Sequence, residues 1–480
     1  MIRKLRCLRI KGGEISWKLQ KKKFRLFDAV LMSVVVIMVV ESAAPAAAIG
    51  PSQFFWWAFL LILFFIPYGL VSSELGTTYA GDGGLYDWVR KAFGSRWGGR
   101  LAWCYWINYP IWMASLAVLF TQVAGQVFGI KLNTVTSIIV QLVFVWVVVI
   151  LGNKPVSESK LILNLAAISK IFVIVSLVVL GIYVAATKGI ANDFSGTNLL
   201  PKFNLSGLSN LSVIIFNFLG FEVVATMSSD MDNPKKQIPQ AIIYGGLLIA
   251  IFYVLAAFAM GTAIPTADLS ASSGLMDSFI LLIGSMNWFV IVIGVLFLYI
   301  LASEMVSWAL GVNYVADYAA KDHSLPAVFG KEDAKGMPVG TGYLNGIVAT
   351  VLVVIAPMIP NQDIFWAFFS LNVVALLLSY TMLFPAFLKL RFSDPDTERP
   401  FKVPGSKLMI QLMTWVPEVI LIITILLTIL PTDSSKAEFS TKMPILIGTI
   451  ITLAIGEIVV RVAEHRHKVA IQADLVEHHS

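Results

Sequence analysis

The chain reads Val39-Val40-Glu41-Ser42-Ala43-Ala44-Pro45-Ala46-Ala47-Ala48-Ile49-Gly50 within an apolar run that covers residues 28–49. A proline in the middle of such a run removes a backbone hydrogen bond, and small side chains around it let other groups approach the backbone closely. The stretch therefore predicts a membrane helix that is interrupted near its middle. The candidate binding residues at this interruption are Glu41, Ser42, Ala43, Ala44 and Pro45.

A second stretch combines a glycine with a carboxylate inside apolar sequence. It reads Phe216-Asn217-Phe218-Leu219-Gly220-Phe221-Glu222 and lies in the run at residues 209–228. Interrupted helices offer free backbone N–H and C=O groups to a substrate at the midplane of the membrane. We therefore expect Phe216, Asn217, Phe218 and Gly220 to bind substrate, with the Phe216 ring covering it. The alternative is that Pro45 and Gly220 only kink their helices for packing.

Twelve runs in the sequence are long and apolar enough to cross about 30 Å of hydrocarbon as helices. Their limits are 28–49, 52–73, 101–126, 134–152, 161–187, 209–228, 240–264, 286–312, 341–360, 364–389, 407–430 and 443–463. The two interrupted runs are the first and the sixth, which hold equivalent places in two five-helix halves. The sequence thus predicts an all-α membrane protein whose core, residues 28–389, is an inverted repeat of 28–187 and 209–389, with the discontinuous helices as members one and six.

Composition independently excludes a soluble protein. Of 480 residues, 58% are apolar and only 13% are charged, which is about half the charged fraction of soluble domains. The basic residues are scattered over short loops, so we expect no nucleic-acid partner. The two cysteines form no CxxC pair and the five histidines fall outside the predicted spans, so we expect no metal site. Phosphate-binding and dinucleotide motifs are absent, and we expect no cofactor.

The distribution of Lys and Arg predicts the orientation of the chain. The N-terminus, the C-terminus and the even-to-odd loops hold 29 of the 35 basic residues, and the opposite loops hold 5. This bias places both termini in the cytoplasm of a cell-membrane protein and requires an even number of spans. We expect a basic tail at 1–27, helices eleven and twelve with their preceding loop at 390–463, and a second tail at 464–480.

The candidates for functional charges inside the membrane are Glu41, Lys170, Glu222 and Glu304, whereas we expect Glu74, Glu418 and Glu457, nearer to span ends, to snorkel or to be solvated. A charge at the bilayer centre costs at least about 2.5–3.5 kcal/mol, so each is a candidate functional group. Glu41 either caps the interruption or contacts a substrate amine. Glu222 either holds the sixth span to the first or carries a proton, and we expect both a structural and a coupling role. Glu304 either bonds to a neighbouring helix or takes part in coupling.

Lys170 lies far from both ends of the fifth span. Its ammonium must contact carbonyl groups or a carboxylate, or lose its proton through desolvation. A fixed ammonium can take the place of a bound sodium ion, and a titrating one can carry a proton. The alternative is a lysine that snorkels along a tilted helix to the interface. We expect Lys170, Glu222 and Glu304 to couple transport, with protons as a possible co-substrate.

Five passages carry a family resemblance. They are Leu26-Phe27-Asp28; Ser73-Glu74-Leu75-Gly76-Thr77-Thr78-Tyr79 with the continuation to Ala92-Phe93-Gly94; Lys170; Gly220-Phe221-Glu222 with Asp232-Asn233-Pro234-Lys235-Lys236; and Arg399-Pro400-Phe401-Lys402-Val403-Pro404-Gly405. In this combination the chain resembles the amino acid–polyamine–organocation superfamily of transporters over most of residues 24–465.

The resemblance implies a LeuT-like core of two inverted five-helix repeats plus two further helices, with substrate between the unwound middles of spans one and six. It also implies that Phe216 occupies the position of an aromatic gate and that Lys170 replaces sodium. The first span departs from the glycine-rich motif that is usual in the family. Glu41, and Glu304 with Ser307-Trp308, are more similar to the glutamate/GABA antiporter and polyamine-transporter branches. The departure leaves the substrate open.

These features predict a secondary active transporter of amino acids or related amines, acting as an antiporter that exchanges an amino acid for its decarboxylated amine. A proton-coupled symporter of amino acids, or of polyamines such as putrescine and agmatine, is the alternative. A channel or a membrane enzyme remains a rival class. An enzyme would need a constellation of His, Ser or Cys at one membrane face, which the sequence lacks.

Overall fold

The structure is a computed structural model that describes residues 37–79, 83–201, 211–222, 233–270, 273–359, 363–432 and 434–477, with the single residues Leu26, Val30 and Leu208. The predicted tail at 1–27, apart from Leu26, lies outside the described residues, as do residues 223–228 of the predicted sixth span. Within the described ranges every regular element is a helix, and none is a strand.

Ten helical segments of the described chain are long and apolar enough to cross a membrane, and they fall on the predicted spans other than the first and the sixth. Eight are single helices: α6 Ser95–Phe128, α7 Thr134–Gly152, α8 Val156–Lys188, α13 Pro234–Ala263, α15 Trp288–Lys321, α16 Val339–Ile355, α19 Lys407–Ile429 and α20 Lys436–Glu477. Two are compound. One joins α3 Gln53–Leu60 to α4 Ile66–Thr78 through the π-helical turn Leu61–Phe65, and the other joins α17 Ile364–Tyr380 to α18 Leu383–Ser393.

In the region of the first span, the described chain holds two short helical pieces, the 3-10 turn Val40–Ser42 and α2 Ala43–Ala47. Met38 and Val39 before them are not helical, and Val39 is extended with φ −99° and ψ 102°. The prediction placed the interruption at Pro45, but Pro45 lies in the first turn of α2. That position tolerates proline, because the first N–H groups of a helix have little intrahelical bonding to lose. The non-helical residues therefore precede Glu41.

The region of the sixth span contains α11, Leu211–Phe216, and then leaves the helical conformation. Residues 217–222 belong to no helix. Gly220 has φ 98°, a left-handed backbone conformation that side-chain-bearing residues rarely adopt. The glycine that marked this stretch in the sequence is therefore required by its backbone geometry.

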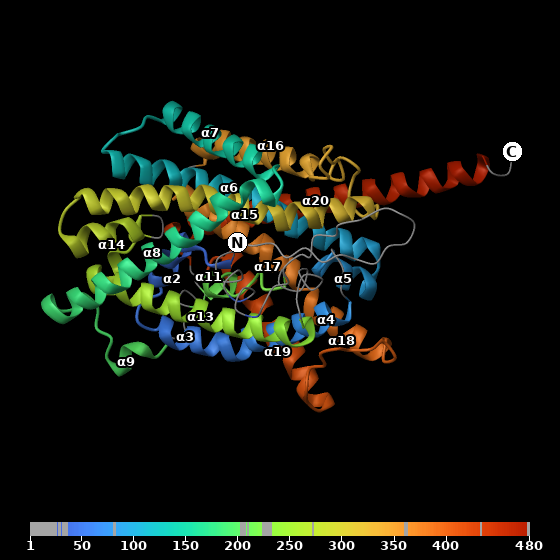
Figure 1. Cartoon of the computed structure of the whole chain (residues 1–480), viewed down its shortest axis with the longest axis horizontal. Helices are drawn as coiled ribbons and strands as arrows, with labels where there is room; N and C mark the ends of the chain where they lie inside the picture. The colour runs from blue at the N-terminus through green and yellow to red at the C-terminus, as the bar shows by residue number, and fades with distance from the viewer. Residues whose placement is uncertain are drawn as a thin grey trace, which may run out of the picture.

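The short pieces α2 and α11 lie inside the bundle, among α13, α15 and α17 (Figure 1), and all of their residues are buried. The outer helices instead expose apolar side chains at helical spacing, as α7 does at Ile139, Val143, Val147 and Ile150. A bundle with a polar-containing centre and an apolar outer face is suited to surrounding lipid.

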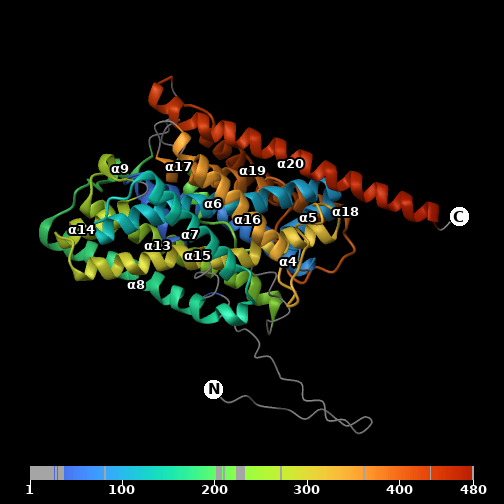
Figure 2. The ribbon, with the colours of Figure 1, turned by 90° about the horizontal axis from the view of Figure 1, so that it is seen from above.

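The two ends of the bundle differ in their elements. The helix α5, Leu85–Phe93, and the end of α18 lie at one end, while α9 Gly196–Leu199 and α14 Gly274–Ile283 lie at the other (Figures 1 and 2). The last helix, α20, projects beyond the bundle at the α5 end (Figure 2). Its 42 residues correspond to about 63 Å, twice the hydrocarbon thickness. Residues 464–477, predicted as a tail, thus continue a helix.

Candidate functional site

Hydroxyl groups hold the non-helical backbone before Glu41. The N–H of Val39 donates to the Tyr253 hydroxyl oxygen at 2.9 Å, and that hydroxyl lies 2.8 Å from the Val39 carbonyl oxygen. The Ser42 hydroxyl lies 2.8 Å from the same carbonyl oxygen and 2.6 Å from Oδ1 of Asn217. Buried backbone groups need such partners once they leave a helix. Ser42 and Asn217 also bring the two predicted interruptions into direct contact.

Lys170 of α8 points into this region and is only 2% exposed. Its ammonium donates to the carbonyl oxygen of Met38 at 2.8 Å and forms a buried ion pair with Glu304 of α15. Both kinds of partner that the sequence required, a carbonyl and a carboxylate, are therefore present. The snorkelling alternative is wrong, because the side chain is directed to the centre of the bundle and not to its surface.

Glu41 differs from Lys170, Glu304 and Glu222, whose charged groups each have a partner among the described residues. Its side chain is 2% exposed, and neither of its oxygens accepts a hydrogen bond from any residue that the structure describes. The Trp112 indole lies beside it without the geometry of a hydrogen bond, and the charges of Glu304 and Lys170 are close enough to act on it. The capping alternative for Glu41 thus finds no hydrogen bond to support it. If both carboxylates are ionised, the two carboxylates and one ammonium of this cluster give one negative charge in excess.

Glu222 is held by three tyrosine hydroxyls from three different helices. Tyr68 of α4, Tyr105 of α6 and Tyr380 of α17 each donate to its carboxylate, the last two at 3.2 and 2.6 Å. The Tyr380 oxygen also accepts the N–H of Gly220 at 3.2 Å. We expected Glu222 to hold the sixth span to the first. Instead, its described partners lie on the second, third and tenth spans, because these helices surround the end of the non-helical stretch.

Aromatic rings surround the beginning of the non-helical stretch at residues 217–222. The Phe216 ring packs edge-on against Trp112 of α6 and Phe369 of α17, with centroids 5.7 and 5.4 Å apart. Trp308 of α15 packs against Trp112 at 5.4 Å, and a Cβ at Gly220 would lie 3.1 Å from its ring. Glycine therefore lets the backbone approach the indole. Phe216, Trp112 and Trp308 form an aromatic cluster next to Glu41.

The remaining candidate residues are packed into the core. Phe218 lies between Trp57 of α3 and Phe65, with centroid distances of 5.1 and 5.0 Å, so its ring turns away from the cluster that contains Phe216. Ala43, Ala44 and Pro45 are buried in α2, and Ala44 faces Gly274 of α14. These side chains set the approach of neighbouring helices.

Sequence reasoning did not find the tyrosines at 68, 105, 253 and 380. Each lies in an apolar span, where most aromatic residues only pack or mark the interface. The one available signal was that a phenol hydroxyl buried in a bundle requires a hydrogen-bond partner. It does not identify that partner.

Glu74 at the end of α4 forms a second buried charge cluster. We expected it to snorkel or to be solvated, but it is 2% exposed. The guanidinium groups of Arg391 and Arg399 both pair with it, and the N–H of Val403 donates to it at 2.7 Å. The loop after α18 thereby folds back over the end of the second span.

The helical bundle, its apolar outer face and its buried charges together define a multi-pass membrane protein. Comparison with known proteins gives its class: the sequence profile of the amino acid permease family matches residues 24–455, and the chain belongs to this family. It is therefore a transporter and not an enzyme, and it falls within the superfamily that the sequence motifs indicated.

Named relatives agree with this class. The chain is 52% identical, over 92% of its length and 95% of the relative, to a protein of Lactococcus lactis named "probable agmatine/putrescine antiporter". It is 24% identical, over 84% of its length and 83% of the relative, to the glutamate/gamma-aminobutyrate antiporter of the same species. The crystal structure of MhsT in complex with L-phenylalanine matches 85% of this chain and 100% of its own, with a TM-score of 0.59 at 16% identity, and so shares the fold.

Proposed function

We propose that this chain is an antiporter that exchanges cationic amines, agmatine against putrescine, across the cell membrane. The substrate would lie between residues 38–42 and residues 217–222, next to Phe216, Trp112 and Trp308. The observation that carries the proposal is the buried Glu41 carboxylate, which no described residue compensates by a hydrogen bond. An ammonium or guanidinium group would supply both the missing charge and the missing donors.

The charge around Glu41 favours a cation over a zwitterion. Lys170 is already engaged by Glu304 and by the Met38 carbonyl, so the nearest ammonium is not available to Glu41. A substrate carboxylate would add a negative charge to a cluster that already has one in excess. One ammonium or guanidinium group of a diamine instead neutralises that excess, and its second cationic end lies away from Glu41. The agmatine/putrescine relative at 52% identity supports the same class of substrate.

Exchange of one dication for another moves no net charge and requires no coupling ion. A Lys170 ammonium that binds the Met38 carbonyl suits a carrier without a coupling ion. The ammonium stabilises the backbone as a bound cation would, and it remains attached to the protein throughout the transport cycle. Glu304 holds that ammonium in place. For Glu222, which accepts hydrogen bonds from three tyrosines, we propose a role in coupling or in support of the sixth span.

The transport cycle follows from the same architecture. We propose twelve spans, with the first and the sixth discontinuous, in two inverted halves at 28–187 and 209–389 and two further helices in 390–463. The termini, 1–27 and 464–480, would be cytoplasmic. Alternating access would rock spans one, two, six and seven against the rest around the bound amine.

Proteoliposomes that contain the purified protein test the exchange directly. Vesicles loaded with unlabelled putrescine should take up external labelled agmatine with saturation, and vesicles without internal amine should not. Glutamate and neutral amino acids inside the vesicles should stimulate uptake weakly or not at all. A proton ionophore should leave the exchange unchanged.

Other outcomes identify the rival functions. Uptake into unloaded vesicles that follows an inward proton gradient would make the protein a symporter. A flux that does not saturate would make it a channel. Strong stimulation by internal glutamate, with none by putrescine, would contradict the cationic site at Glu41.

A further inference from the structure

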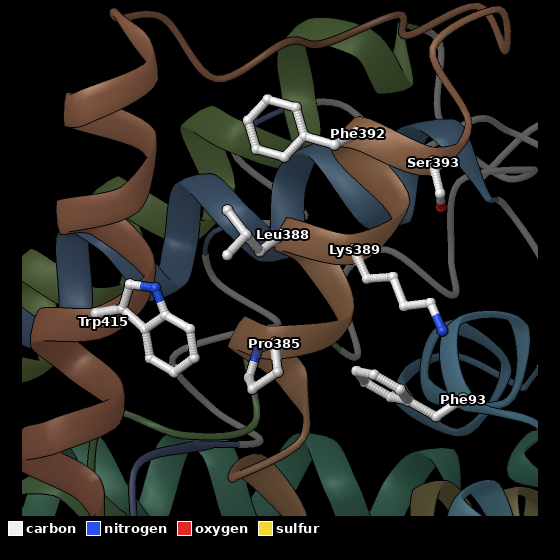
Figure 3. Close-up of a pocket in the computed structure, with 7 residues that line it drawn as sticks. All are labelled: Phe93, Pro385, Leu388, Lys389, Phe392, Ser393 and Trp415. Atoms are coloured by element: carbon white, nitrogen blue, oxygen red, sulfur yellow. The ribbon is translucent and has the colours of Figure 1, made fainter.

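A pocket of about 560 Å³ lies at the α5 end of the bundle, away from the substrate site. Three helices line it, through Phe93 of α5, Pro385, Leu388, Lys389 and Phe392 of α18, and Trp415 of α19. Figure 3 shows the Trp415 indole on one side of α18, facing Pro385 and Leu388, and the Lys389 side chain reaching toward Phe93 on the other side. The walls are thus apolar and aromatic, with an ammonium at one side.

The pocket continues into the outer face of the protein. Trp415 is 49% exposed, and it belongs to a row of exposed apolar side chains at helical spacing along α19. The row consists of Leu408, Leu412, Trp415, Val419, Ile422 and Leu426. In a protein that crosses a membrane, such a row faces lipid chains, so the pocket opens toward lipid.

One lysine, Lys389, lines the pocket, and a second, Lys407, lies over the Phe392 ring that also lines it. The Lys389 ammonium lies 5.0 Å from the centroid of the Phe93 ring, and the Lys407 ammonium lies 5.8 Å from that of Phe392. Both side chains are exposed, and neither pairs with a carboxylate among the described residues. The nearby guanidiniums of Arg391 and Arg399 are different, because Glu74 engages them. Lys389 and Lys407 therefore leave two positive charges for an external anion.

We propose that this pocket binds one anionic phospholipid. Its phosphate would lie between Lys389 and Lys407, and an acyl chain would lie against Pro385, Leu388 and Trp415 and continue along α19. Basic groups beside an apolar groove at the membrane surface are the chemistry that recognises such lipids. A soluble anion would not use the apolar walls, and a second protein copy would not need the two lysines.

Lipid bound at this pocket would contact α18, and α18 is linked to the second span of the transport core. The next turn of α18 carries Arg391, which pairs with Glu74 at the end of the second span. A lipid that holds α18 would therefore hold one side of this contact. The effect on transport would come through the second span.

Fluorescence of Trp415 in vesicles tests the lipid site. The signal of this residue is the difference between the wild type, which has 13 tryptophans, and Trp415→Phe. In phosphatidylcholine vesicles, brominated phosphatidylglycerol at a small mole fraction should quench Trp415 more than the same fraction of brominated phosphatidylcholine. Each lysine near the headgroup contributes about a fivefold preference, so the two lysines set an upper limit of about thirtyfold.

Charge variants separate this pocket from general attraction to the surface. Lys389→Gln with Lys407→Gln should make the two brominated lipids quench Trp415 equally. Lys331→Gln with Lys335→Gln removes the same charge from exposed positions in another even-to-odd loop and should keep the difference.

Three results would overturn the proposal. Equal quenching by both lipids in the wild type would show that the pocket does not select anions. Loss of the difference on adding inorganic phosphate, but not chloride at the same ionic strength, would assign the lysines to a soluble anion. Protection of Trp415 from both lipids, together with a dimer in the vesicles, would assign the surface to a second copy of the chain.

Discussion

Glu74 and Glu41 are equally buried, but their surroundings differ in one respect. Glu74 receives two guanidinium groups and a backbone N–H, so both of its oxygens have partners. Glu41 has an ammonium in its vicinity, but that ammonium pairs with Glu304, and no described residue donates a hydrogen bond to Glu41. Buried charge costs free energy wherever it lies. The difference suggests that Glu74 supports the fold, whereas Glu41, which lies beside the two non-helical stretches, is retained for a ligand.

The largest effect should come from the same isosteric change at these two positions. Glu74→Gln leaves Arg391 and Arg399 buried side by side, and breaking a buried pair costs about 3–5 kcal/mol. Glu41→Gln removes a charge that nothing compensates, and should leave the stability unchanged or raise it. Thermal unfolding in detergent measures both. If Glu41→Gln lowered the melting temperature as much as Glu74→Gln, Glu41 would be a structural residue.

Lys170→Ala should abolish exchange while the protein is still expressed. The Met38 carbonyl loses its donor and Glu304 is left without its cation, so the backbone before Glu41 is no longer held. The double variant Lys170→Ala with Glu304→Gln removes the leftover charge and should recover the melting temperature but not transport. Uptake of labelled agmatine measures activity, and full activity of the single variant would remove the assigned role.

Glu41→Gln should weaken transport of cationic amines more than that of any neutral amino acid the protein accepts. A hydrogen bond to a charged group contributes about 1.5–3 kcal/mol, which corresponds to about a 10- to 100-fold loss in apparent affinity for agmatine. Glu418→Gln is the matched control, because Glu418 is also a buried carboxylate in a span but lies on α19. Equal loss for cationic and neutral substrates would argue against direct contact.

Phe216→Ala should have the smallest effect. An edge-on aromatic contact contributes about 0.5–1.5 kcal/mol, so the apparent affinity for agmatine should fall by up to about tenfold. Phe120→Ala removes a ring from the contact between α6 and α7 at Phe144 and should not change the affinity. An unchanged apparent affinity in Phe216→Ala would exclude this ring from the site.

The sequence predicted the class of fold because its evidence was local. The length of an apolar run predicts a membrane helix whatever that helix packs against. Gly220 and Lys170 could be recognised because each is unusual within its own apolar segment. The partners of these residues were not predictable, because they come from distant parts of the chain. Lys170 and Glu304 are on different helices, and Glu74 meets arginines more than 300 residues away. The interruption was predicted at Pro45, and this position was wrong because a proline in the first turn of a helix does not interrupt it.

The central claim is that Glu41 binds the cationic end of the substrate beside the non-helical stretches. An experimental structure with agmatine bound tests it most directly. The account predicts an ammonium or guanidinium within hydrogen-bond distance of a Glu41 oxygen, with the chain of the ligand against Phe216 and residues 217–222. A ligand bound elsewhere, with Glu41 still unpaired or paired with Lys170, would contradict it.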